Sequence, residues 1–185
     1  EVLALANVPT YNPNSNVGID PNNRRNRVLT DTYEPGSTMK PFAAAIAIQS
    51  GKFKPTTVVN VNGGSIRFGS AVIHDTHSHG SLTVEQIIQV SSNVGAVKLA
   101  LSFKPEEYWT FLDSVGFGRR TDSGFPGEVR GILRPWKKWV PVDQATMSFG
   151  HGIAVTVLQL ARAYTIFTSN GELKPLSLLR QDSVP

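Results

Sequence analysis

A serine and a lysine stand three residues apart, at Ser37 and Lys40, where the sequence predicts the beginning of a helix. Residues at i and i+3 of a helix lie on one face, so we expect the hydroxyl and the amine within hydrogen-bonding reach. A serine attacks a carbonyl when a base takes its proton, and a neutral lysine amine can be that base. The pair therefore predicts a nucleophile with its base.

Such a base works only when the amine of Lys40 is uncharged. Its ordinary pKa of ~10.4 must fall by ~3 units, which corresponds to roughly 4 kcal/mol and requires burial or a neighbouring cation. A helix N-terminus adds partial positive charge, which also favours an oxyanion at the backbone N–H of Ser37. We therefore expect the Lys40 side chain to be shielded from water.

A second polar cluster, Ser91-Ser92-Asn93, lies at a predicted break between two helices. The first of these helices starts at Thr83, which forms a capping box with Gln86. Serine and asparagine favour local side-chain hydrogen bonds over a helix interior, so the helix is expected to give way there and to resume through Leu101. Ser-x-x-Lys followed by Ser-x-Asn is the order of motifs in penicillin-binding enzymes.

Further helices and some short strands must position these residues. Proline, glycine and capping signals predict helices over 37–50 and 105–115, and a last helix that starts with a capping box at Thr156 and ends at Asn170-Gly171. Apolar residues between 58 and 73, broken by Asn62-Gly63-Gly64, predict a β-hairpin with its turn at those glycines. Residues 1–7 are typical of a strand, 9–26 of a surface loop and 116–141 of an irregular segment. The pattern indicates an α/β or α+β arrangement of helices packed on a sheet.

Composition excludes several classes of protein. A chain of 185 residues predicts one core, and the net charge of +4 is too weak to indicate a nucleic-acid partner. The densest basic stretch, residues 24–27, is interpreted as a solvated loop rather than a polyanion site. The absence of cysteine excludes disulfides and thiolate zinc sites, and no run of 18 apolar residues could span a bilayer.

Three segments together resemble a known family. They are Glu34 to Pro41, Ser91 to Gly95, and Phe149-Gly150-His151-Gly152 through Ala161. The chain resembles the class B penicillin-binding proteins over its whole length, and especially those of the division-specific, penicillin-binding protein 3 type. The resemblance implies an α/β (α+β) sandwich in which helices flank an antiparallel sheet, with Ser37 at the N-terminus of a central buried helix.

The activity implied by the resemblance is that of a peptidoglycan D,D-transpeptidase in septal cell-wall synthesis. Ser37 would attack the D-Ala-D-Ala bond of a stem peptide, release D-alanine and pass the acyl group to an amine of a neighbouring strand. β-Lactams would acylate the same serine. Lys40 would accept its proton, Ser91 would relay a proton to the leaving nitrogen, Asn93 would bind the substrate's carbonyl, and His151 would line the site.

The resemblance also sets expectations for the surroundings. No cofactor or metal is needed, and the partners would be stem peptides, β-lactams and, for the intact protein, divisome proteins, but no nucleic acid. The protein would work at the periplasmic face of the bacterial inner membrane.

One family element is absent from the sequence. None of the eight lysines is followed by Thr-Gly or Ser-Gly, although such a strand would contribute the second oxyanion N–H. We therefore expect residues 1–185 to be a partial transpeptidase domain that lacks this strand and the N-terminal anchor. The alternative is a non-catalytic relative or truncated interaction module. A β-lactamase is less well supported, because no residue is identified that would activate the deacylating water.

Other residues allow competing interpretations. His74, His77 and His79 could bind zinc together with Asp75, but on a strand His74 would point away from the other two, so a polar loop is favoured. The tryptophans at positions 136 and 139 could stack on sugars, although such side chains more often anchor an irregular segment.

Overall fold

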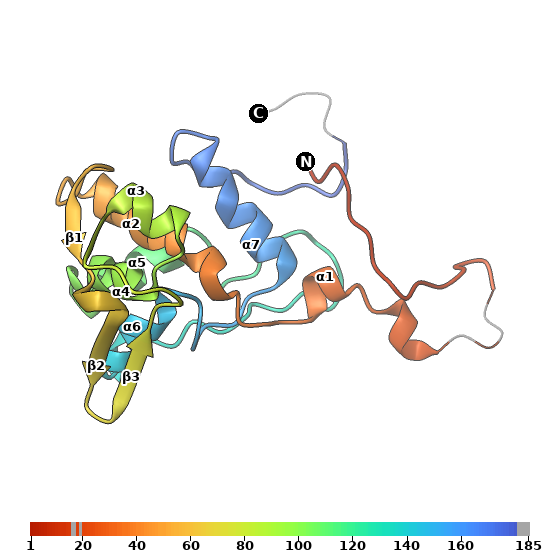
Figure 1. The fold of residues 1–185 in the computed structure, drawn as a ribbon. Coiled ribbons are helices and arrows are strands. Elements are labelled where there is room, and N and C mark those ends of the chain that lie inside the picture. Colours follow the sequence, from red (N-terminus) through yellow and green to blue (C-terminus); the bar gives the residue numbers. More distant parts are fainter. Residues whose placement is uncertain (16–17, 19, 181–185) are drawn as a thin grey trace. The chain divides into compact units, whose positions relative to one another are not determined.

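The computed structural model describes residues 1–15, 18 and 20–180 (Figure 1). The chain groups into two compact units. Unit 1 comprises Glu1–Tyr33, Val115–Ile132 and Val155–Pro185, and unit 2 comprises Glu34–Ser114 and Leu133–Ala154. The length predicted one core. Neither unit is a continuous segment, so no change of composition along the chain marks the division.

Unit 2 contains most of the secondary structure. Its helical elements are η2 (Gly36–Met39), α2 (Lys40–Gln49), η3 (Asn62–Gly64), α3 (Val84–Gln89), α4 (Asn93–Leu101), α5 (Pro105–Ser114), η4 (Trp136–Lys138) and α6 (Pro141–Met147), where η denotes a 3₁₀ turn. Its strands are β1 (Val58–Asn60), β2 (Ser65–Phe68), β3 (Ala71–His74) and β4 (Ser81–Thr83).

The predicted helix starts are confirmed in α3, α4 and α5. Thr83 and Gln86 form the capping box of α3, and Ser92 caps α4 after the predicted break. Helix α6 was not predicted, because its seven residues lie inside a proline-rich stretch without a periodic signal. Its start is fixed by Asp143, whose carboxylate accepts the Val140 N–H at 2.9 Å.

The strands form two separate antiparallel pairs. β1 pairs with β4, and β2 pairs with β3 across a turn at Gly69 and Ser70. The predicted hairpin turn at Asn62–Gly64 is wrong, because this segment is the 3₁₀ turn η3 between strands of different sheets. Asn62 and Gly63 adopt the positive φ that such a pair favours, but strand pairing rather than turn chemistry decides which strands it joins.

The core of unit 2 is built around α2 and α4. Helix α4 is buried on most of its surface, and it packs on α2, α3 and α6. A Cβ at Gly95 of α4 would come within 2.5 Å of Ile87 in α3, so only glycine allows this close approach. The contact fixes α3 against α4, and with them the turn of residues 90–92 that joins them.

Unit 1 contains η1 (Pro21–Arg24), α1 (Arg27–Thr30), α7 (Val157–Tyr164) and η5 (Thr165–Phe167). The Thr156 capping box that starts α7 is confirmed, whereas the short α1 was not predicted. The strand predicted at residues 1–7 is wrong. These residues form no ladder, although the Val2 N–H donates to the Ser177 carbonyl at 2.8 Å.

Glu128 holds the irregular segment of unit 1 together. Its carboxylate accepts the Thr121 N–H at 2.5 Å, the Thr121 hydroxyl at 2.6 Å and the Ser123 hydroxyl at 2.8 Å. Burial raises the pKa of Glu128, but these hydrogen bonds outweigh it and the net pKa is lowered. The segment thus folds around an ionised carboxylate.

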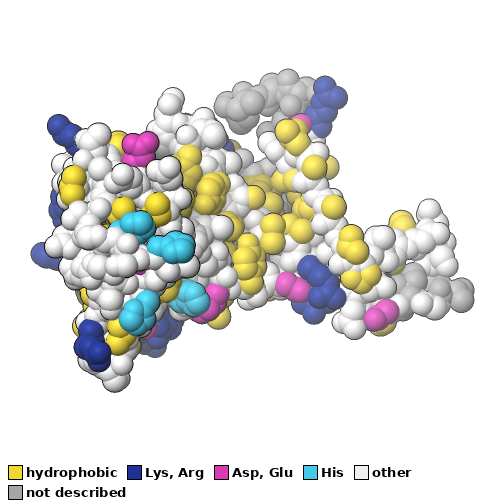
Figure 2. All heavy atoms as spheres, viewed as in Figure 1, with side chains coloured by type: hydrophobic (Ala, Val, Ile, Leu, Met, Phe, Trp, Pro, Cys, Tyr) yellow, Lys and Arg dark blue, Asp and Glu magenta, His cyan; other side chains and the backbone are white. Residues whose placement is uncertain are grey.

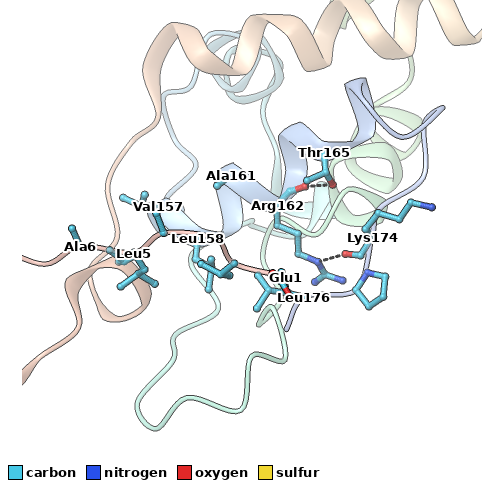
Figure 3. A pocket seen from close by; sticks show the side chains of 14 residues that line it. Glu1, Leu5, Ala6, Val157, Leu158, Ala161, Arg162, Thr165, Lys174 and Leu176 are labelled. Carbon is cyan, nitrogen blue, oxygen red and sulfur yellow. Dashed lines mark hydrogen bonds between the residues drawn. The ribbon is translucent and has the colours of Figure 1, made fainter. Parts of the chain in front are cut away.

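Unit 1 also has an open, mainly apolar pocket of about 390 Å³ (Figure 3). It is lined by the first residues of the chain, by α7 and by residues 174–176. At its edge the Arg162 side chain donates to the Lys174 carbonyl at 3.0 Å. None of the five candidate site residues lines it. Within the described ranges, no helix has the length and apolar character needed to cross a membrane.

Candidate active site

All five candidate residues lie in unit 2. Ser37 belongs to η2 and Lys40 begins α2, Ser91 precedes α4 and Asn93 begins it, and His151 follows α6. The structure thus places residues from three separate stretches of the chain in the same unit.

Ser37 is the second residue of η2, which leads directly into α2. The helix predicted over 37–50 is therefore a 3₁₀ turn followed by an α-helix, with Pro41 in the first turn of the latter, where a missing N–H is tolerated. The Ser37 side chain is exposed, and its hydroxyl makes no hydrogen bond to any described residue. It is free to meet a ligand.

The turn of Ser37 lies in backbone contact with the loop of residues 149–152. The Gly36 N–H donates to the Gly150 carbonyl at 3.2 Å. A Cβ built on Gly150 would lie 2.1 Å from the Gly36 carbonyl oxygen, and Gly150 has a φ of +85°. Only glycine fits here on both counts, so this contact fixes the residue immediately before Ser37.

Lys40 is 2% exposed, as the sequence required of a base. Its amine donates to the Ser91 carbonyl at 2.5 Å and to the Ser91 hydroxyl at 2.7 Å. Burial lowers the pKa of Lys40 from its usual 10.5 to about 8, while the negative charge of Asp75 acts in the opposite direction. A substantial fraction of the amine is then neutral at mildly alkaline pH.

The spacing argument expected the Lys40 amine to contact Ser37, but in the structure it contacts Ser91. A long lysine side chain can leave its own turn, and the Ser91 carbonyl offers a stronger acceptor than a neighbouring hydroxyl. A neutral amine has two N–H donors and one lone pair, and Ser91 occupies the two donors. The lone pair remains available to accept a proton.

The turn of residues 91–93 is held by the segment that follows β3. The Ser92 hydroxyl donates to Asp75 Oδ2 at 2.6 Å, and Asp75 Oδ1 accepts the Val94 N–H at 2.9 Å. The Asn93 amide donates to the His74 carbonyl at 2.8 Å, which leaves its second N–H and its oxygen for a ligand.

His151 stands on the exposed side of the 149–152 loop. Its Nδ1 lies 3.2 Å from Glu34 Oε2, and Glu34 Oε1 accepts the Gly152 N–H at 2.8 Å. Both side chains are more than half exposed, at 59% and 53%. Glu34 thus ties the loop to the residues just before Ser37.

Sequence reasoning missed three residues that make these contacts, Glu34, Asp75 and Gly150. Asp75 was considered only as a metal ligand, and Glu34 lies 118 residues from Gly152 along the chain. A glycine-flanked histidine was the one signal that pointed to the loop of residues 149–152.

The histidines gather on the face of unit 2 shown in Figure 2. Over the described residues, no cluster of three or more histidine, cysteine or acidic side chains could hold a metal ion. Asp75 is instead engaged with α4. The Trp139 Nε1–H donates to the Arg134 carbonyl at 2.9 Å, which supports an anchoring role for that side chain.

Comparison with known proteins gives a consistent result. Residues 1–184 match the family model described as the penicillin binding protein transpeptidase domain. The chain is 48% identical over 185 residues to a "Probable peptidoglycan D,D-transpeptidase PenA" of Neisseria flavescens, covering 100% of this chain and 46% of that protein. It is 40% identical over 182 residues to "Peptidoglycan D,D-transpeptidase FtsI" of Escherichia coli K12, covering 98% and 31%.

A solved structure is similar as well. The apo transpeptidase domain of Burkholderia pseudomallei penicillin-binding protein 3 superposes with a TM-score of 0.83 at 46% identity, covering 87% of this chain and 49% of that one. The chain therefore spans between about a third and a half of the length of these proteins. The α+β fold expected from the sequence is confirmed.

Proposed function

Because the chain belongs to the penicillin binding protein transpeptidase family, we propose that it forms part of the transpeptidase domain of a peptidoglycan D,D-transpeptidase. One observation carries the proposal. Lys40 is almost fully buried, and its amine is bound by Ser91. It is the first residue of α2, which directly follows the turn that contains the exposed Ser37. The reaction would cross-link stem peptides through an acyl-serine.

Acylation starts at the Ser37 hydroxyl. Its oxygen attacks the carbonyl carbon between the two D-alanines, and its proton passes to the lone pair of the Lys40 amine. The oxyanion that forms would be stabilised at the backbone N–H of Ser37, at the start of a helical turn. The resulting ammonium is held by the Ser91 carbonyl and hydroxyl, both within 2.7 Å of it.

Expulsion of D-alanine requires a proton on the leaving nitrogen. Because the Ser91 hydroxyl touches the Lys40 amine, it can give its own proton to that nitrogen and take one from the ammonium. The C–N bond breaks, D-alanine leaves, and Lys40 is neutral again. An amine of a second strand then attacks the acyl-serine by the same steps in reverse order.

Two residues would contact the substrate directly. Asn93 offers its second N–H to a peptide carbonyl, since the first is held by His74. His151 stands on the loop that contacts Gly36, one residue before Ser37, which supports a role of its exposed ring in lining the site. β-Lactams, which carry a strained amide, would acylate Ser37 by the same first steps.

A non-catalytic scaffold is the competing reading, and no contact in unit 2 favours it. Burial lowers the pKa of Lys40 to about 8 because it disfavours the charged amine. A lysine with a purely structural role would not be stabilised by such burial. Groups with perturbed pKa values are typical of catalytic sites, and the exposed Ser37 lies one turn before Lys40 in the chain.

The substrate determines where the protein would work. Peptidoglycan lies outside the inner membrane, so we place the domain at its periplasmic face, and the similarity to FtsI supports a role in septal synthesis with divisome partners. The proposed steps use side chains and backbone groups of the chain and call for no cofactor.

The proposal is tested by incubating the full-length protein with a fluorescent penicillin. We expect a covalent adduct that survives denaturing electrophoresis and maps by mass spectrometry to the peptide containing Ser37. The Ser37→Ala variant should fold and remain unlabelled. A wild-type protein without serine-dependent label would overturn the assignment, and rapid turnover of a chromogenic cephalosporin would favour a β-lactamase instead.

A further inference from the structure

We infer that Asp75 is a positioning residue for the proposed acylation: its carboxylate fixes the turn of Ser91, Ser92 and Asn93 on which the Lys40 amine is held. The inference rests on the proposed function. Asp75 itself touches neither the nucleophile nor its base, and it acts through the turn.

The contacts of Asp75 form a short bridge between β3 and α4. Both carboxylate oxygens are used, one by the Ser92 hydroxyl at 2.6 Å and the other by the Val94 N–H at 2.9 Å. The Asp75 N–H donates to the Gly64 carbonyl at 2.8 Å, so the backbone of Asp75 is itself held by the segment before β2. The carboxylate thus ties the Ser92 side chain and the Val94 backbone to the segment that follows β3.

Ser91 needs such support because its backbone is in an unfavourable region. Its φ is +57°, which costs a non-glycine residue about 1–2 kcal/mol. The residue keeps this conformation while its carbonyl and hydroxyl both face the Lys40 amine. If the bridge from Asp75 is lost, the turn can relax, and both contacts to the base are lost with it.

Asp75 has a second, electrostatic effect on the same amine. Its negative charge favours the ammonium form and raises the pKa of Lys40 against the larger effect of burial. Other charged groups on the helices packed against α2 are engaged or exposed. Lys98 of α4 donates to Asn62 at 2.9 Å, and Glu85 of α3 is exposed. Among the described residues, Asp75 is the charged group that acts on Lys40.

Two substitutions separate positioning from charge. In Asp75→Asn the amide oxygen can still accept the Val94 N–H and the NH₂ group can donate to the Ser92 oxygen, so the bridge is kept and the charge is removed. In Asp75→Ala both are removed. Thr76→Ala, at the adjacent exposed position, and Glu85→Gln, which removes an exposed negative charge, are the matched controls.

The first measurement is the acylation rate of the full-length protein by fluorescent penicillin over about pH 6 to 10. For Asp75→Ala we expect a loss of roughly 100-fold, the size expected for a reacting group displaced by about 1 Å. For Asp75→Asn we expect labelling to persist and the rising limb of the pH profile to move to lower pH, because removal of the negative charge lowers the pKa of Lys40. Both controls should match the wild type.

The second measurement does not depend on activity. The ε-carbon resonance of Lys40 is followed against pH in protein carrying ¹³C-labelled lysine, and Lys40→Met identifies the signal by its disappearance. We expect this titration also to move to lower pH in Asp75→Asn but not in Glu85→Gln. A melting curve for each variant shows that it is folded.

The outcomes separate the two ideas. If the wild type is not acylated, the proposed function fails, while a lower Lys40 titration in Asp75→Asn still supports the link from Asp75 to the amine. If the wild type is acylated but Asp75→Ala keeps its full rate, the positioning role is overturned. An unchanged Lys40 titration in Asp75→Asn would overturn the electrostatic part.

Discussion

Substitution of Gly150 by alanine tests whether the loop of residues 149–152 positions Ser37, the proposed nucleophile. The new Cβ would lie 2.1 Å from the Gly36 carbonyl oxygen and 2.3 Å from the Gly36 nitrogen, whereas ordinary contact begins at 3.4 Å. The two backbones must therefore separate by about 1.3 Å. Because Gly36 directly precedes Ser37, this displacement reaches the nucleophile.

The expected cost has two parts. Alanine at a φ of +85° costs about 1–2 kcal/mol in backbone strain. The steric overlap adds about 1–3 kcal/mol, as for other overpacked sites. A displacement of about 1 Å near reacting atoms costs roughly 100-fold in rate, so the acylation rate should fall by at least that factor.

Gly51→Ala is the matched control. Gly51 lies in the same unit with a φ of +74°, but nothing lies within 4 Å of a Cβ there. It should lose about 1–2 kcal/mol in stability and keep its acylation rate. Rates of fluorescent-penicillin acylation are divided by the folded fraction from a denaturant titration of each full-length variant. If folded Gly150→Ala acylates as fast as Gly51→Ala, the loop does not position Ser37 and the reasoning is refuted.

Four further predictions follow from the contacts described above. Wild-type acylation should rise with pH through a midpoint near 8, because only the neutral Lys40 amine accepts a proton and its pKa is about 8; a midpoint near the usual 10.5 would contradict burial. Lys40→Met should abolish labelling while the melting temperature is retained, since methionine fills the buried volume, and near-native acylation would exclude Lys40 as the base. Glu128→Gln should lose about 1.5–3 kcal/mol in unfolding free energy at neutral pH. Because the folded-state pKa of Glu128 is lowered, the free energy of unfolding of the wild type should fall as the pH drops through that pKa. If the stability of Glu128→Gln fell equally with pH, the stabilising role of the ionised carboxylate would be disproved. His151→Ala should change stability by less than about 1 kcal/mol, because its pair with Glu34 is exposed, but should weaken substrate binding as a raised KM; an unchanged KM would remove His151 from the site.

The helices around the site could be predicted because their signals are local. A capping box such as Thr83 with Gln86 acts within four residues, and the Ser91-Ser92-Asn93 break follows from side chains that bond their own backbone. Helix α6 and the strand pairs could not be predicted in the same way. Whether Asn62-Gly63 turns a hairpin depends on which strands pair, and β1 finds its partner β4 beyond the next hairpin.

The sequence alone determined which chemical groups are present and how the nearest of them are spaced. Ser37 and Lys40 lie on consecutive helical turns because one turn separates them in any helix. Only the tertiary structure decided that the amine reaches Ser91, that Asp75 holds the turn behind it, and that Gly150 lies against Gly36. These contacts join residues up to more than a hundred positions apart, and packing rather than local geometry brings them together.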